Sequence, residues 1–269
     1  AATGAGFAAV IGREVTSGPA APRSWFALQS QMDEAALVGV PGLVMKAENL
    51  GVVLNRVEGI AAGSDAALQV LDLSDAPLAI ATGYGTSRTL SVDGALGPMS
   101  RASGTLSLSV GDFVSARGSL AIETSVRSVR LADGSSVSVD ALTVGGSGVE
   151  VFAGLRGPAR IDSSDALNPK AQGMSLSGGA LALAVMSPRD ADLKGYQGVR
   201  WVGLSAEAGG LELVGIPGLS ASAETVSLET NQVLGLQAGV NPNLKVVDFK
   251  ANPITVAVGP TSTRVLNTD

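Results

Sequence analysis

Few residues of this chain have the types and spacing to carry chemistry, and one polar loop gathers the best of them. The sequence holds no histidine and no cysteine, which excludes Ser-His-Asp and Cys-His catalysis and the usual zinc sites. In the polar stretch 156–173, Asp162, Asp165 and Asn168 offer oxygen ligands of the kind that Ca²⁺ prefers. We expect a solvated loop there, with calcium as a weak candidate. No catalytic, cofactor-binding or metal residue is therefore predicted.

The composition describes a chain that can bury a large aliphatic core. Hydrophobic residues make up 45% of it and aromatic residues only 3%. The formal net charge is -6 and no basic run is present, which disfavours a nucleic-acid partner. No stretch approaches the ~18 consecutive apolar residues that identify a membrane helix. The sequence therefore predicts no transmembrane segment.

One long spacing recurs along the chain. Trp25 matches Trp201, "VGVPGL" matches "VGIPGL", and "LQVLDLSDAPLAIATG" matches "LKVVDFKANPITVAVG". All these matches share one ungapped offset, the distance along the chain from position 25 to position 201, which we call the repeat offset. Self-similarity at a fixed period indicates a repeat architecture. We predict a tandem array in which 1–24 end one repeat, 25–200 form a full repeat and 201–269 begin the next. Two diverged domains are the alternative.

A shorter phrase lies within this period. It alternates apolar and other residues, with one extra residue and a small residue near its middle, and it occurs at 142–151, 174–183 and 204–213. Alternation with a period of two predicts strands that have one buried face. The extra residue shifts the phase, so we expect a bulge or bend there. Gly146 and Gly178, at the small position, suit such a bulge.

The connections between these phrases are short and turn-like. Asp133-Gly134 is a strong hairpin signal between two alternating segments. The fold class predicted is all-β, an elongated architecture of stacked strands. A β-solenoid is the first choice, because repeats that bury their faces only against neighbours form a rod. A long antiparallel meander folded on itself, or two sandwiches, are the alternatives.

Three phrases resemble the repeat regions of very large bacterial cell-surface or secreted proteins of the adhesin-like type. They are "SRASGTLSLSVGDFVSARGSLAIETS", "VRLADGSSVSVDALTVGGSGVEVFAGL" and "GMSLSGGALALAVMS". The resemblance covers nearly the whole chain in style and phrase order. It implies an extracellular or cell-surface location and a structural or adhesive role. It brings no catalytic residues.

Together these observations predict a non-enzymatic structural module of a giant extracellular repeat protein. Such a module would form or decorate a filament, sheath or stalk, with adhesion left open as a further role. We expect it to associate with identical copies through strand edges and aliphatic faces. A surface glycan or lipid partner stays open, and no cofactor is predicted. The alternatives are a lipid-binding β-groove and, below it, a polysaccharide-processing β-helix enzyme.

Overall fold

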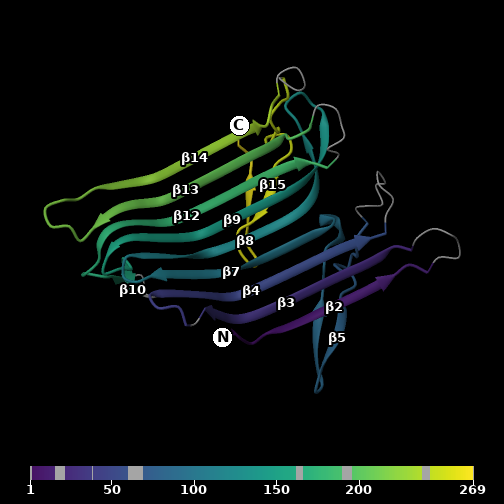
Figure 1. The fold of residues 1–269 in the computed structure, drawn as a ribbon, viewed down its shortest axis with the longest axis horizontal. Helices are drawn as coiled ribbons and strands as arrows, with labels where there is room; N and C mark the ends of the chain where they lie inside the picture. Colours follow the sequence, from purple (N-terminus) through teal and green to yellow (C-terminus); the bar gives the residue numbers. More distant parts are fainter. Residues whose placement is uncertain are drawn as a thin grey trace.

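The dominant feature of the chain is one antiparallel sheet of ten strands (Figure 1). The computed structural model describes residues 2–15, 22–37, 39–59, 69–161, 166–189, 196–237 and 243–268. The strands of the sheet are β1 (Ala2–Thr3), β2 (Gly6–Arg13), β3 (Ser24–Leu37), β4 (Leu43–Glu58), β7 (Met99–Val110), β8 (Val114–Arg130), β9 (Ser136–Leu155), β12 (Gln172–Pro188), β13 (Arg200–Val214) and β14 (Ser222–Leu234). From β3 to β14 they lie side by side in chain order, while β1 and β2 both pair with β3.

The all-β prediction is confirmed, since the described residues hold no helix except a 3-10 turn at Gly94–Leu96. The β-solenoid is not confirmed, because all neighbouring strands from β3 to β14 pair antiparallel. The strand order is that of an antiparallel meander. Tight turns explain it: Leu131 N donates to Ser135 O at 2.8 Å around Gly134, whose φ of 87° suits glycine. The chain thus reverses between β8 and β9 instead of coiling onward.

The predicted bulges are confirmed in the phrases at 142–151 and 174–183, whereas the ladders of the phrase at 204–213 keep one register. The ladders shift register between Glu48 and Gly51 where β4 pairs with β7, and again around Gly179 where β12 pairs with β9. Residues with positive φ mark this level on several strands: Asn49, Gly148, Gly178 and Thr225. An extra residue at a bulge restarts the alternation in phase. Apolar side chains on both sides of the kink can therefore face the same way.

Two small hairpins pack on one face of the sheet (Figure 1). One consists of β5 (Leu78–Gly83) and β6 (Thr86–Leu90) and contacts β2. The other consists of β15 (Ile254–Ala257) and β16 (Thr263–Leu266) and contacts β8, β9, β12 and β13. A third pair of short strands, β10 (Arg160–Ile161) and β11 (Ala166–Leu167), lies in the connection between β9 and β12.

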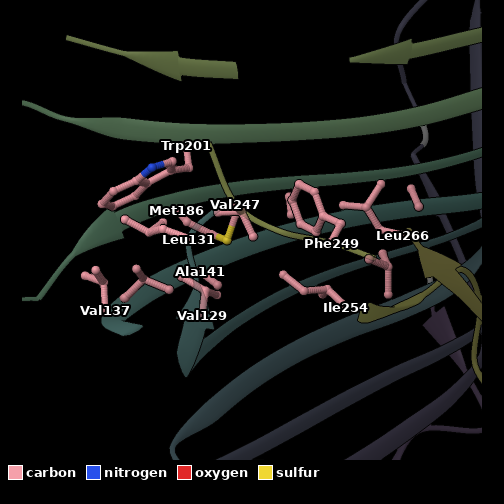
Figure 2. Packing of buried hydrophobic residues seen from close by; sticks show 14 of the residues in the cluster. Val129, Leu131, Val137, Ala141, Met186, Trp201, Val247, Phe249, Ile254 and Leu266 are labelled. Carbon is pink, nitrogen blue, oxygen red and sulfur yellow. The ribbon is translucent and has the colours of Figure 1, made fainter. Parts of the chain in front are cut away.

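The main core lies between the second hairpin and the sheet (Figure 2). Trp201 and Met186 of the sheet are fully buried there, against Phe249 from the segment that leads into β15. Phe249 can approach β13 closely only because residue 203 is a glycine. A Cβ at Gly203 would overlap the Phe249 ring. A smaller core joins the first hairpin to the sheet, where Leu90 and Val92 pack with Ala8 of β2 and Ala27 of β3.

Candidate interaction surfaces

Two tryptophans tie the segments before the small hairpins to the sheet in the same way. Trp25 Nε1 donates to Gln69 O at 3.0 Å, and Trp201 Nε1 donates to Lys245 O at 3.0 Å. The two donor residues are separated in the sequence by the repeat offset, and so are the two acceptor residues. The full burial of Trp201 suits an anchor and not an exposed sugar-binding platform.

Two asparagines repeat the pattern on the neighbouring strands. Asn55 Nδ2 of β4 donates to Leu71 O at 2.7 Å, and Asn231 Nδ2 of β14 donates to Val247 O at 2.8 Å. These donors and acceptors are again separated by the repeat offset. The pair β13–β14 is therefore fastened to its hairpin segment as β3–β4 is fastened to its own. The division into repeats at 25 and 201 stays a prediction.

The weak calcium candidate falls mostly outside the described residues, where Asp162 and Asp165 lie. Asn168 is described, and its amide holds its own loop together. Its Nδ2 donates to Arg156 O at 2.8 Å, and its Oδ1 accepts from Lys170 N at 3.0 Å. In the part of the chain that the structure describes, no three acidic side chains gather closely enough to hold a metal ion. The calcium hypothesis stays a prediction.

A polar groove of about 880 Å³ runs between the two hairpins on the face that they cover. Its floor comes from β3, β4, β7 and β8. One wall is β6 with Arg88, and the other is the turn 260–262 after β15. Hydroxyl and amide groups line much of it, including Gln29, Ser103, Thr105, Ser119 and Ser262. Groups of this kind hydrogen-bond water or a polar ligand, but no pair of carboxylates lines this groove.

A buried ionic cluster lies next to this groove. Glu123 of β8 is 3% exposed, and its Oε2 accepts from Arg101 Nε at 2.8 Å and Nη2 at 2.6 Å. Its Oε1 accepts from Arg127 Nη2 at 2.9 Å. Burial raises the pKa of the Glu123 carboxyl, but the hydrogen bonds and charges of Arg101 and Arg127 outweigh burial and leave the pKa below its ordinary value. A carboxylate held ionised in this way suits structure better than proton transfer.

Sequence reasoning missed this cluster. Its signal is a polar run on the inward face of β8, where Glu123, Ser125 and Arg127 alternate with outward residues. Elsewhere on this strand the inward positions hold small or aliphatic residues such as Ala121 and Val129. The cross-strand partner Arg101 lies on β7 and is 22 residues away in sequence. That separation hides the pairing until the register of β7 and β8 is known.

The opposite face of the sheet is rich in aliphatic side chains, and several of them are exposed. One row across it, traced through the paired strands, contains Phe7, Val52, Ile122, Val144, Leu183 and Leu204. Phe7 is 63% exposed and Ile122 is 49% exposed. Leu142 and Leu228, in neighbouring rows of this face, are also exposed. Contiguous exposed apolar surface commonly marks an interaction site.

Comparison with known proteins finds no matching family model, no matching curated protein and no matching solved structure. In the described part of the chain, no helix is long and apolar enough to cross a membrane. The function is therefore inferred from the geometry of the chain itself.

Proposed function

We propose that this chain is a structural module of a giant extracellular repeat protein that forms or decorates a filament, sheath or stalk. The observation that carries the proposal is that the same tryptophan hydrogen bond occurs twice within one sheet. Trp25 on β3 and Trp201 on β13 make the same bond, and β4, β7, β8, β9 and β12 lie between these strands. Each further repeat of this kind would widen the sheet without a new type of contact.

Self-association follows from the edges of the sheet. Among the described residues, β14 pairs with β13 alone and β2 pairs with β3 alone. The outer backbone N–H and C=O groups of such strands are a template for another strand. The exposed aliphatic face offers a second surface for association. Identical copies are therefore the proposed partners, and the proposal assigns no reaction to the chain.

The extracellular location and the open question of adhesion rest on the resemblance of the phrases to bacterial surface repeats. A polar groove rich in hydroxyl and amide groups is compatible with adhesion to a surface glycan. No nucleic-acid partner is proposed, because the net charge is -6.

Electron microscopy of the purified protein over a range of concentrations tests the proposal. We expect ribbons, fibres or rods whose width or length grows with concentration, because association adds strands at the edges. Small-angle scattering should report an elongated particle under the same conditions. A compact, monodisperse monomer at every concentration would contradict the proposal.

A lipid-binding β-groove is the second candidate, and the aliphatic row through the exposed Ile122 and the half-buried Leu204 favours it. An acyl chain lying on this face would cover apolar surface that is otherwise in water. Native mass spectrometry of protein purified without detergent would then detect bound lipid. Lipid-free protein, with no uptake from added fatty acid, would remove this candidate.

A further inference from the structure

We infer that the outer edge of β14 binds a strand of the β7 type, meaning one with the sequence Met99–Val110, in the register that joins β4 to β7. This deepens the proposed function and rests on it, because it names the strand with which a further repeat would widen the sheet. The β7 of a folded copy is already paired with β4 and β8, so a further repeat would have to supply this strand. Three observations carry it. They are the equivalence of β14 and β4, the transferred register, and the charge that this register places opposite β14.

β14 has the local geometry of β4. Asn231 and Asn55 make the same hydrogen bond to a backbone carbonyl, at 2.8 Å and 2.7 Å. The kink also recurs, since Asn49 has φ 53° and Thr225 has φ 54° at positions separated by the repeat offset. β4 uses the edge away from β3 to pair with β7. The corresponding edge of β14 has no partner among the described strands.

The register of β4 with β7 is fixed by the structure. Val53 lies opposite Arg101, and Gly51 lies opposite Ser103. A shift by the repeat offset turns Val53 into Glu229 and Gly51 into Ser227. In this register, a β7-type strand on β14 would place its arginine directly across from Glu229.

This position gives the edge a chemical preference. Directly opposite side chains on paired strands interact, and opposite charges stabilise the pair. Glu229 is exposed and so is available to an incoming arginine. Ser227 also fits where β4 has Gly51, because a Cβ at Gly51 would meet Ser103 Oγ at 3.6 Å, an ordinary contact.

The same charges disfavour pairing of β14 with a second β14. The strand carries Glu224 and Glu229 and has no lysine or arginine. An antiparallel pair of two such strands would gather acidic side chains at the junction without a cation to offset them. A β7-type strand brings Arg101 and no acidic residue. The edge of β14 therefore complements β7 in charge as well as in backbone pattern.

Thiol cross-linking tests the register, because the chain has no native cysteine. The full chain with Glu229→Cys is mixed with a synthetic peptide of residues 99–110 that carries Arg101→Cys. We expect disulfide formation at least several-fold faster than with the matched peptide that carries Ala102→Cys, since residue 102 points to the other face of the strand. Equal rates with the two peptides would overturn the inference.

Charge exchange tests the chemistry with the cysteine-free chain. Fluorescence anisotropy of the labelled peptide should show binding that Glu229→Arg weakens by roughly two- to five-fold at low salt. A peptide with Arg101→Glu should restore the affinity for that variant. Glu224→Arg is the matched control on the same strand, because its register partner is Thr105, and it should change binding less. Equal effects of the two variants, or no binding by the full chain, would overturn the inference.

The outcomes separate this inference from the proposed function. Fibres in the electron microscope without register-specific cross-linking would overturn the assignment of the β14 edge and leave the structural role standing. Register-specific cross-linking in a chain that stays a compact monomer at every concentration would support the edge and contradict the filament.

Discussion

At the scale of single residues, the ion pairs of Glu123 stabilise the fold. Its carboxylate is buried and is held by Arg101 and Arg127. We expect Glu123→Gln to lower the free energy of unfolding by about 1–3 kcal/mol, because two partly buried guanidinium groups lose their counter-charge. Urea unfolding measures the loss. Glu14→Gln is the matched control, since the more exposed Glu14–Arg23 pair should contribute less. A larger loss for Glu14→Gln would contradict this account.

The pKa of Glu123 gives this stabilisation a pH dependence. The folded protein holds this pKa below its ordinary value of 4.5, so the unfolded chain binds the proton more readily. The stabilisation is fully present above that value and is lost as pH falls through the folded pKa. The stability gap between the natural chain and Glu123→Gln should therefore stay constant from about pH 7 down to about pH 4.5 and shrink as the pH falls further, as urea unfolding at each pH would show. A gap that widens in acid would show that the sign is wrong.

At the scale of elements, the docking of the β15–β16 hairpin depends on a small residue beneath it. Gly203 of β13 lies against the Phe249 ring and the Leu266 side chain. Gly203→Ala should destabilise the chain by about 1–3 kcal/mol, because the added methyl group overpacks this contact. Hydrogen exchange should also speed up in β15 and β16.

Gly209 of the same strand is the matched control for this prediction. A Cβ there would meet its nearest neighbour, Ser177 O, at 3.6 Å, which is an ordinary contact. Gly209→Ala should therefore leave exchange in the hairpin unchanged. If both alanine variants exchanged alike, the hairpin would not be seated through Gly203.

At the scale of the whole molecule, the sheet has two faces of opposite character. Hairpins and a polar groove occupy one face, and exposed aliphatic side chains occupy the other. We expect Ile122→Lys to weaken self-association by about tenfold, because the charged group removes an apolar contact from the exposed face. Sedimentation velocity over a range of concentrations measures the change.

The control for this change adds the same charge without removing an aliphatic side chain. Thr124 lies two residues along β8 on the same face and is exposed. Thr124→Lys should weaken association less than Ile122→Lys. Equal weakening would attribute the effect to charge repulsion instead of aliphatic contact.

Much of the local structure could be predicted from the sequence because it depends on neighbouring residues. Alternation predicted strands, and the small residue in the phrase at 174–183 predicted the bulge now seen near Gly178. Asp133-Gly134 predicted the turn between β8 and β9, and Asp133 Oδ1 accepts from Ser135 N at 2.9 Å in it. Alternation could not distinguish a solenoid from a meander, since the alternation of apolar residues is the same in both.

The candidate surfaces were harder to predict because they join residues that are distant in the chain. Arg101 meets Glu123 only through the register of β7 and β8. The groove needs β6 on one side and the turn after β15 on the other, with the sheet as its floor. The local sequence does not specify which distant segment supplies the partner in these contacts.

The sequence by itself determined the strand character, the turns, the bulges and the repeat offset, because each depends on local sterics or on identity between segments. Only the tertiary structure decided that the strands lie antiparallel in one sheet, that both hairpins share one face, and that Glu123 lies between two arginines. The physical reason is that strand pairing and side-chain contacts are long-range. Their free energy depends on which segments meet, and a pattern of alternation does not specify the partner.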